Sequence, residues 1–450
     1  MTNGIEQLLR EFDKHESYLN GKIERGIEEY RKGQFVLDFK DKDGTPLSGV
    51  QVKVKQVKHE FRFGCNTFYL DQFQDEERRT LYRERFKQVF NYAVVPFYWD
   101  TLEPEEGKPR FDKDAPFVSR RPAIDTIMEF CKENGIRAKG HCLVYNAFQP
   151  SWISDDSQTL KRQVTKRVKE IAERYGEDIF DFDVINEMIF VYKNAYAGSG
   201  VRNMQITDEQ SHEKWAFDLC RRYLPNANLY WNEGMFETFG AEYRGFRSYY
   251  YLTIQKMLRE GVSIDGIGMQ YHAFADMQQA DKTLKQVCNP LRLLDALERY
   301  GDFNLPIHLS EVSIPSFNNE TENEELQAAL TEKLYKLWFS AKHCEAIVWW
   351  NFADGTAYGA ENRFHAGLLR EDCSIKPAYQ AIDRLINSEW NTSFETTADK
   401  TLRFSGFYGD YEIEAEYQGR KIKKSLRLHK DNTGYDNTRC DFRAKTILFD

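Results

Sequence analysis

The sequence predicts an α/β protein, a (β/α)8 TIM barrel with a small accessory β-sandwich formed from the N- and C-terminal segments. A length of 450 residues suits a barrel with a small appendage. From about residue 61 to 390, short apolar runs alternate with amphipathic helical stretches. Outside this region, both ends of the chain show the period-2 alternation that is typical of antiparallel strands.

Eight short apolar runs are the candidate barrel strands, and helical stretches such as 75–90 and 122–135 lie between them. Strands that alternate with helices imply a parallel sheet with covered faces, and at this length a closed barrel is the natural solution. The predicted strands are 61–66, 92–99, 137–144, 182–187, 228–233, 266–272, 306–312 and 346–352.

The chain ends predict two further parts. Residues 1–33 read as a charged helical segment, and residues 34–60 with 400–450 as an accessory β-domain beside a catalytic barrel over 61–390. Neither β-segment is long enough for a stable sheet by itself, so we expect the two to pair. We expect this β-domain to hold the two ends of the chain together, and sugar binding is the alternative role.

Composition excludes several classes of protein. A net charge of −9 argues against a nucleic-acid binder, which should show a basic face. No run of about 18 apolar residues is present, so we expect no membrane span. The N-terminus has no apolar signal-peptide core, which predicts a cytoplasmic protein, or a secreted one if a signal peptide has been removed.

The cysteines predict the same kind of compartment. The sequence has eight, none in a Cys-x-x-Cys pair, and Cys65 and Cys142 fall in apolar strand-like runs. Disulfides are the alternative, but buried free thiols fit these surroundings better and favour a reducing compartment.

Polar residues close the predicted strands one after another. In a barrel these positions converge on the C-terminal rim, where the active site lies. The strand-end residues are Asn66, Asp100, His141, Asn186, Glu187, Asn232, Glu233, Gln270, His272, Glu311, Asn351 and Asp354.

Two of these carboxylates predict glycoside cleavage. Glu187 closes the fourth strand and Glu311 the seventh, so they should face each other across the barrel mouth. One carboxyl must be protonated to help the leaving oxygen depart, and the other must be ionised. Two like charges about 5.5 Å apart repel by about 3 kcal/mol, about two pKa units, which keeps one carboxyl protonated. Glu233 is a rival catalyst because Asn232-Glu233 repeats the Asn-Glu pattern.

No metal or cofactor is expected. His308 and Glu311 have an H-x-x-E spacing, but residues three apart on a strand point to opposite faces and cannot share one ion. No glycine-rich phosphate loop follows any predicted strand. The expected partner is a carbohydrate substrate, with no nucleic acid and no membrane; no oligomeric state is predicted.

Several motifs carry a family resemblance. Residues 140–152 (GHCLVYN with PSW), 182–187 (FDVINE), 266–272 (GIGMQYH) and 308–312 (HLSEV) resemble glycoside hydrolase family 10. The similarity runs from residue 61 to 382, essentially the whole barrel, and FSGFYGDYEI in the tail also resembles a flanking β-segment of many members. The best-known members are retaining endo-β-1,4-xylanases. The resemblance therefore implies double-displacement hydrolysis of β-1,4-xylosidic bonds in xylan or xylo-oligosaccharides.

The resemblance also implies roles for individual residues. Glu187 matches the acid/base and Glu311 the nucleophile. Only one of the adjacent Trp349 and Trp350 can face the sugar, and Trp350 matches the family residue that does. The remaining substrate-binding positions expected are His141, Tyr145, Asn186, Asn232, Gln270 and His272.

The second strand departs from the family pattern. Members usually carry Glu, Asn and Lys where this chain has Val94, Val95 and Tyr98. In those members, the Glu, Asn and Lys bind sugars beyond the cleavage point. Val cannot hydrogen-bond through its side chain, whereas Tyr98 offers a stacking face. Two alternatives follow: a glycosidase of the same mechanism acting on another or decorated glycan or glycoconjugate, and a catalytically silent carbohydrate-binding barrel.

Overall fold

A computed structural model describes residues 4–189, 211–240, 248–275, 284–285, 288–430, 435–436, 441–442 and 444–449. The chain divides into two compact units. One comprises Met1–Glu16 with Phe63–Ala381, and the other comprises Ser17–Arg62 with Ile382–Asp450.

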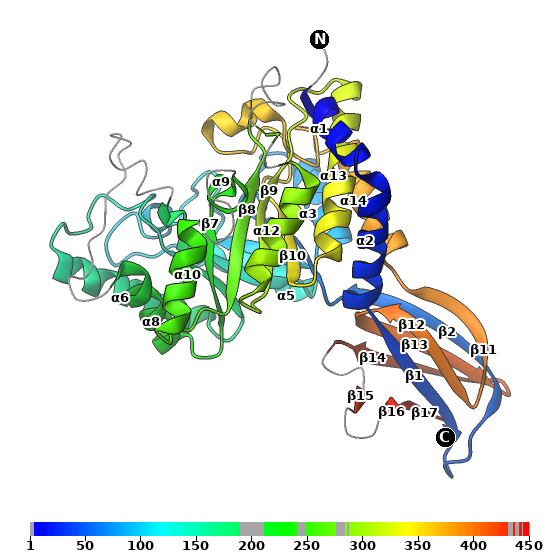
Figure 1. Cartoon of the computed structure of the whole chain (residues 1–450). Coiled ribbons are helices and arrows are strands. Elements are labelled where there is room, and N and C mark those ends of the chain that lie inside the picture. The colour runs from blue at the N-terminus through cyan, green and yellow to red at the C-terminus, as the bar shows by residue number, and fades with distance from the viewer. Residues whose placement is uncertain are drawn as a thin grey trace. The chain divides into compact units, whose positions relative to one another are not determined.

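The first unit is a closed parallel barrel of eight strands, in the order β10-β3-β4-β5-β6-β7-β8-β9 (Figure 1). The fold predicted from the sequence is thereby confirmed, and each predicted apolar run overlaps one barrel strand. Consecutive strands pair in parallel, and the last strand, β10, lies next to both β9 and the first strand, β3, which closes the ring. The strands are β3 (Arg62–Asn66), β4 (Tyr92–Pro96), β5 (Arg137–Val144), β6 (Asp181–Asn186), β7 (Asn228–Glu233), β8 (Gly266–His272), β9 (Ile307–Ser313) and β10 (Cys344–Trp349).

Helices connect the barrel strands, and several begin at a residue that caps the helix. Asp75, Asp156 and Asn289 each accept a hydrogen bond from a backbone N–H of the first turn, which satisfies a donor that has no partner within the helix. The helices are α1 (Gly4–Asp13), α3 (Glu76–Val89), α4 (Trp99–Leu102), α5 (Ile124–Glu133), α6 (Ser157–Tyr175), α8 (His212–Tyr223), α9 (Met235–Phe239), α10 (Tyr249–Arg259), α12 (Pro290–Gly301), α13 (Thr321–Ser340), η4 (Gly359–Phe364) and α14 (Pro377–Arg384).

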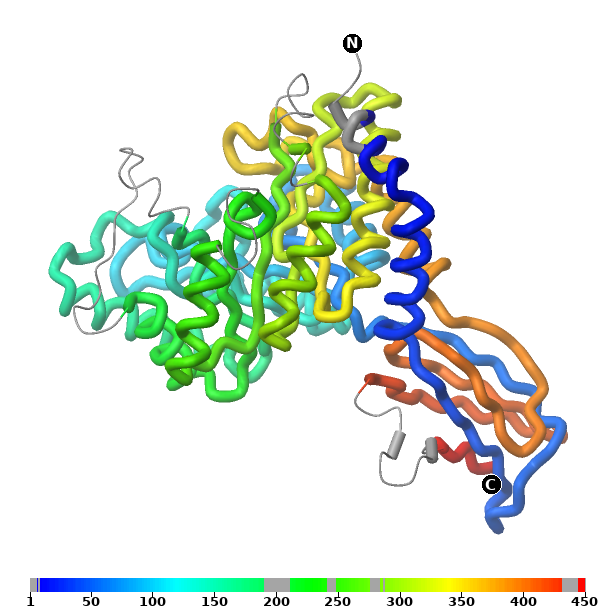
Figure 2. Tube along the Cα trace, in the orientation of Figure 1, coloured from blue at the N-terminus to red at the C-terminus, as the bar shows by residue number. Residues whose placement is uncertain are grey.

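The second unit is a seven-stranded sheet in the order β14-β13-β2-β11-β12-β1-β17, with the helix α2 (Glu16–Tyr30) and the short π-helix η5 (Leu385–Glu389). Figure 2 shows its blue N-terminal strands interleaved with orange and red C-terminal ones, so both ends of the chain build one sheet. The strands are β1 (Lys32–Asp41), β2 (Ser48–His59), β11 (Ser393–Asp399), β12 (Thr401–Phe407), β13 (Gly409–Tyr417), β14 (Arg420–Leu428) and β17 (Lys445–Phe449), with a separate β15 (Tyr435–Asp436) and β16 (Asp441–Phe442) pair.

Alternation along these strands builds a second hydrophobic core. Val50, Val52 and Val54 of β2 are buried while the residues between them are exposed. They pack with Phe35 of β1 and Ile413 of β13, among others. The edge strands β14 and β17 also contact each other, so the sheet curls around this core. Segments that cannot bury a face alone thus share one core.

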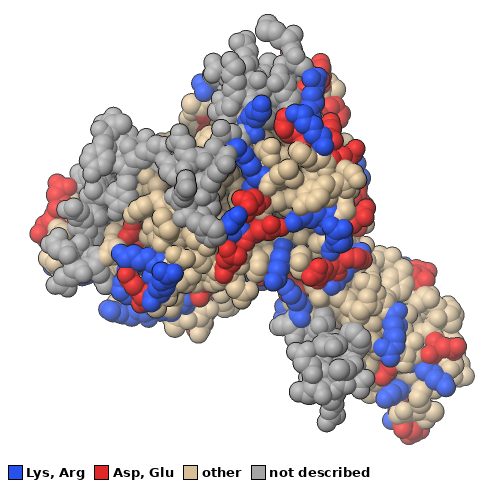
Figure 3. Space-filling model, in the orientation of Figure 1, with Lys and Arg blue, Asp and Glu red and all other residues tan. Residues whose placement is uncertain are grey.

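On the face seen in Figure 3, acidic and basic side chains are interspersed over the barrel helices. Within the described ranges, no helix is long and apolar enough to cross a membrane. Seven cysteines are free and buried, whereas Cys440 lies outside the described residues.

Candidate active site

A cleft of about 1130 Å³, counted to its open mouth, lies at the carboxyl ends of the barrel strands. Both predicted catalytic carboxylates line it: Glu187 directly follows β6, and Glu311 lies in β9. Other lining residues come from the ends of several strands and from the loops after them, as expected for a TIM barrel. These are Phe68, Tyr98, Arg120, Arg121, Tyr145, Phe148, Asn186, Gly234, Met235, Phe236, Glu237, Gln270, His272, Phe274, Trp350, Tyr358 and Glu361.

Glu311 is surrounded by hydrogen-bond donors. Its Oε1 accepts from Asn232 Nδ2 at 2.6 Å and from Gln270 Nε2 at 3.1 Å, and its Oε2 lies 3.0 Å from His272 Nε2. Only 4% of the residue is exposed, so a carboxylate here needs partners. Donors directed at both oxygens can compensate a negative charge on this buried group. The arrangement therefore suits an anionic Glu311.

The donors around Glu311 are themselves held in place. Asn232 Nδ2 also donates to Asn186 Oδ1 at 2.7 Å, and Ser310 donates to Asn232 Oδ1. His272 Nδ1 lies 2.9 Å from Ser313 Oγ. Burial opposes the charged form of His272, but the hydrogen bond to Glu311 and its charge raise the pKa of this histidine overall. Glu311 thus faces a fixed set of donors.

His141 lies on the other side of Glu311, with Nε2 3.9 Å from Oε1. Its Nδ1 is 2.9 Å from Asp183 Oδ2, and Asp183 Oδ1 is 2.7 Å from Lys139 Nζ. The side chains of Lys139, His141 and Asp183 are at most 2% exposed. Removing one member would leave a buried charge without its partner, which is strongly destabilising. This buried group therefore fixes the orientation of His141.

Glu187 differs from Glu311 in both backbone and surroundings. Its φ of 49° lies in the left-handed region, which turns the chain at the end of β6, and its backbone N–H donates to Asn232 O at 2.9 Å. Burial, and then the charge of Glu311, raise the pKa of Glu187, against hydrogen bonds from Tyr145 and Gln270 that lower it. A carboxyl with a raised pKa can carry the proton that a general acid must donate.

The structure brings most of the predicted substrate-binding residues to the cleft. Tyr145, Asn186, Gln270, His272 and Trp350 line it with the two carboxylates. The other two predicted residues do not line it. They are His141 and Asn232, which are buried beneath the cleft and contact Glu311.

The neighbouring Trp349 and the rival Glu233 point elsewhere. Trp349 is fully buried and donates its Nε1–H to Ala366 O at 3.0 Å. Glu233 is also fully buried and does not line the cleft. Its carboxyl accepts from the backbone N–H groups of Ile189 at 3.0 Å and Gly234 at 3.1 Å. Burial raises the pKa of Glu233 to about 8. This carboxyl therefore stabilises the backbone at Ile189 and Gly234 and does not face the cleft.

The wall next to β4 is aromatic. Val94 and Val95 are buried and do not line the cleft, whereas Tyr98 does. The Tyr98 ring lies 5.7 Å from that of Phe68 and 4.9 Å from that of Phe148. No side chain of β4 therefore offers a sugar hydroxyl a polar partner in this cleft.

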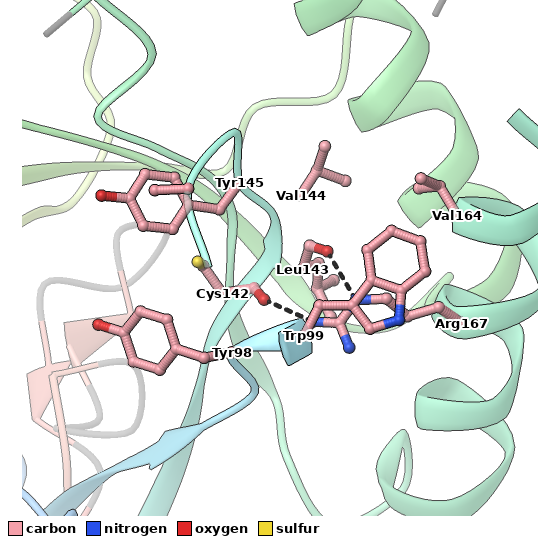
Figure 4. Close-up of a pocket in the computed structure, with 9 residues that line it drawn as sticks. Tyr98, Trp99, Cys142, Leu143, Val144, Tyr145, Val164 and Arg167 are labelled. Carbon is pink, nitrogen blue, oxygen red and sulfur yellow. Dashed lines mark hydrogen bonds between the residues drawn. The ribbon is translucent and has the colours of Figure 1, made fainter. Parts of the chain in front are cut away.

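A buried arginine, Arg167, stabilises the backbone that carries this aromatic wall. Arg167 donates to Cys142 O at 3.1 Å, to Leu143 O at 3.2 Å and to Phe97 O. Figure 4 shows the first two bonds, with Tyr98 and Tyr145 side by side and their hydroxyls pointing away from Arg167. The carbonyls belong to residues next to or near both tyrosines, so this arginine positions the wall.

Sequence reasoning missed several cleft residues. Arg120 and Arg121 come from the loop before α5, and Tyr358 and Glu361 come from the segment after β10. Loops after the strands of a TIM barrel build its active-site face. In the sequence, the pair of adjacent arginines before Pro122 was the feature that could have indicated a contribution of this loop to the cleft.

No group of three or more His, Cys, Asp and Glu that could hold a metal ion occurs among the residues that the structure describes. His308 is fully buried and stacks on Tyr230, with ring centroids 4.2 Å apart.

Comparison with known proteins gives a family match. The model of the family described as "Glycosyl hydrolase family 10" matches residues 54–385, which include all eight barrel strands.

Curated relatives match over most of the chain. An anti-sigma-I factor, RsgI6, from Acetivibrio thermocellus is 27% identical over 419 residues, which cover 90% of this chain and 48% of that protein. Endo-1,4-beta-xylanase 2 from Arabidopsis thaliana is 25% identical over 427 residues, covering 93% of this chain and 35% of that protein. The chain thus spans about a third to a half of the length of these relatives.

Solved structures agree on the fold. Xylanase 10B from Thermotoga petrophila, in complex with xylobiose, superposes with a TM-score of 0.56 at 23% identity, covering 73% of this chain and 95% of that one. The intracellular xylanase TsXylA from Thermoanaerobacterium saccharolyticum, as a mutant with xylotetraose, gives 0.55 at 20% identity, covering 72% and 95%. At such identities the likeness concerns the barrel fold.

Proposed function

The chain belongs to glycosyl hydrolase family 10, and we propose that it is a retaining glycosidase that cleaves β-1,4-xylosidic bonds in xylan or xylo-oligosaccharides. One observation carries the proposal: Glu187 and Glu311 share one cleft but have opposite surroundings. Glu311 accepts hydrogen bonds from Asn232 and Gln270 and contacts His272, whereas burial and the charge of Glu311 raise the pKa of Glu187. A carboxyl with a raised pKa beside a carboxyl held by hydrogen-bond donors matches an acid and a nucleophile.

The chemistry proceeds in two displacements. Glu187 gives its proton to the glycosidic oxygen while an oxygen of Glu311 attacks the anomeric carbon, so the bond to the leaving sugar breaks as the glycosyl–enzyme bond forms. Glu187 is then ionised and takes a proton from water. The water oxygen attacks the anomeric carbon and releases Glu311. Two inversions give net retention.

The placement of Gln270 supports two closely spaced carboxyls. Its Nε2 donates to Glu311 at 3.1 Å, and a hydrogen bond from the same side chain lowers the pKa of Glu187. One amide group thus acts on both carboxyls, which supports the short separation of retaining enzymes, about 5–5.5 Å, over the wider gap of an inverting mechanism.

A turnover experiment tests the proposal. The full chain is incubated with an aryl β-xyloside and with xylo-oligosaccharides, and early-time NMR follows the anomer released. We expect cleavage with an initial β-anomer, and an initial α-anomer would refute retention. Cleavage of another aryl glycoside but no xyloside would indicate a different glycan, and sugar binding without any turnover would indicate a silent barrel.

A further inference from the structure

Two adjacent arginines enter the cleft next to its aromatic wall. Arg120 and Arg121 both line the cleft, and Arg121 is only 7% exposed. The Arg121 guanidinium lies 4.1 Å from the centroid of the Tyr98 ring and 5.0 Å from that of Phe68. An arginine packed on two rings is held in place and presents a fixed set of donors.

Neither arginine has a carboxylate partner within the described part of the chain. Arg120 donates only to the neutral amide oxygen of Asn351, at 3.3 Å from each terminal nitrogen, and Arg121 Nη1 donates to Arg120 O at 2.9 Å. The Nε atoms of both arginines are buried without a hydrogen-bond partner. Buried charges are normally paired, so two positive charges here are short of an anion.

The nearby acids do not fill this role. Glu361 acts on Arg120 over a longer range and is bonded to Asn351, whose Nδ2 donates to Glu361 Oε2 at 3.1 Å. Asp100 acts on Arg121 in the same way without an ion pair between them. Burial therefore still dominates: it lowers the pKa of Arg120 to about 10 and also lowers that of Arg121.

We infer that Arg120 and Arg121 bind a carboxylate on the substrate, so that the preferred glycan carries a uronic acid near the sugar that is cleaved. A planar guanidinium matches a carboxylate with two parallel hydrogen bonds, whereas a neutral hydroxyl leaves the charge unpaired. The inference rests on the proposed function, because it names a substituent of the glycan in the same cleft.

The arginines lie close enough to the reacting groups to select the substrate. The Tyr98 ring that Arg121 covers lies 5.5 Å from the His141 ring, and His141 is 3.9 Å from Glu311. The Tyr98 ring thus lies between the Arg121 guanidinium and His141, which is next to the proposed nucleophile. A uronic acid bound here would belong to a sugar beside the cleaved bond.

A binding experiment on the full chain tests the inference. The Glu311→Gln protein is titrated calorimetrically with a xylo-oligosaccharide that bears one glucuronic acid and with the same compound after its carboxyl is reduced to an alcohol. Because hydrogen bonds to charged groups are strong, we expect the acid to bind roughly 10- to 100-fold more tightly. Added salt should reduce this ratio.

Variants separate recognition from packing. Arg121→Gln and Arg120→Gln should reduce the affinity ratio by about tenfold, and Arg121→Lys should retain part of it because it keeps the charge without the fork. Arg162→Gln, on the exposed side of α6, is the matched control and should keep the full ratio. The ratio compares two ligands on one protein, so a loss of stability does not alter it.

Equal affinity for the acid and its reduced form, or a ratio that Arg121→Gln leaves unchanged, would overturn the inference. Tighter binding of a sulfated xylo-oligosaccharide than of the uronate would overturn the assignment to a carboxylate. Since binding is measured separately from turnover, a chain that cleaves no glycoside but keeps the affinity ratio would refute only the proposed function.

Discussion

The hydroxyl of Tyr145 donates a hydrogen bond to Glu187 Oε2, the carboxyl that we propose as the acid/base. The bond favours the ionised carboxyl and so lowers the pKa of Glu187, whereas burial and the charge of Glu311 raise it. Tyr145 directly follows β5, the third barrel strand. Tyr145 therefore lowers the pH at which Glu187 loses its proton.

Tyr145→Phe should move the alkaline limb of the pH profile upward. Without the hydroxyl, the pKa of Glu187 rises further, so its proton persists to higher pH, by about one pH unit for one hydrogen bond to a charged group. The profile of kcat/KM against pH measures this, because it reports the free enzyme. Tyr358→Phe is the control, since Tyr358 lines the same cleft and is 53% exposed. A limb that stays in place or moves down would contradict the assignment.

Replacement of either carboxylate should give a different product with azide. Glu311→Ala should reduce kcat by about 10²–10⁴-fold or more, and azide should rescue an aryl glycoside as a glycosyl azide of inverted configuration. Glu187→Ala should slow substrates with poor leaving groups most, and its azide product should keep the configuration of the substrate. NMR of the two azides distinguishes the roles. Activity of Glu311→Ala above about a tenth of the wild-type level would show that Glu311 is not the nucleophile.

Local patterns predicted the barrel because the strands are short apolar runs, most of which end at or next to polar residues. The same pattern predicted that Glu187 and Glu311 would lie together, because the carboxyl ends of the strands of a closed barrel meet on one rim, and both residues line the cleft. The depth of a residue was harder to predict: His141 and Asn232 were expected to touch the sugar but lie beneath the cleft. Their burial depends on neighbours from other strands.

Local patterns could not predict the cleft residues that come from the loops. Arg121 reaches the cleft because Arg110 donates to Arg121 O at 3.1 Å and to Thr101 O at 2.9 Å, and so shapes the loop before α5. Such contacts join residues that no short-range periodicity relates. The stacking face expected on Tyr98 is likewise covered by Arg121, which the sequence of the strand alone could not reveal.

Glu233→Gln should separate a structural carboxyl from a catalytic one. The pKa of Glu233 is raised from 4.5 to about 8, so below pH 8 it is largely protonated, and glutamine keeps its size and neutral charge but accepts only one of the two backbone N–H bonds. We expect kcat to stay within about tenfold of the wild type, against the 10²–10⁴-fold loss of a catalytic acid. Rates on an aryl glycoside, beside those of Glu187→Gln, measure this. A loss as large as that of Glu187→Gln would make Glu233 the acid.

The same variant should become more stable than the wild type as the pH rises. The unfolded chain releases the Glu233 proton above about pH 4.5, whereas the folded chain keeps it to about pH 8, so folding stability falls over this window. The slope for one group is about 1.4 kcal/mol per pH unit. Glutamine does not titrate, so the difference in free energy of unfolding should grow in its favour between these limits and then level off. Urea unfolding at several pH values measures it, and a constant difference would contradict the raised pKa.

The wall at Tyr98 predicts weak cleavage of linear, unsubstituted xylan. A distal sugar that packs on this wall loses water from its hydroxyls, and no side chain of β4 lines the cleft to take the place of the Glu, Asn and Lys that family members carry there. Each unpaired hydroxyl costs about 1–3 kcal/mol, and two of them would weaken binding roughly 30-fold to 10⁴-fold. Stacking offers little compensation, because Arg121 covers the Tyr98 ring and Phe68 and Phe148 meet it at a steep angle.

We therefore expect kcat/KM on linear xylohexaose to be at least about tenfold below that on a short oligosaccharide that bears a uronic acid or an aryl aglycone. Product analysis should show cleavage near the decoration, because binding energy from the substituent must replace what the distal sugar does not supply. An aryl xyloside without a distal sugar is the control, since its rate does not depend on the wall. Efficient mid-chain cleavage of xylohexaose, at a rate equal to that of the decorated substrate, would mean that a polar group outside this wall binds the distal sugar.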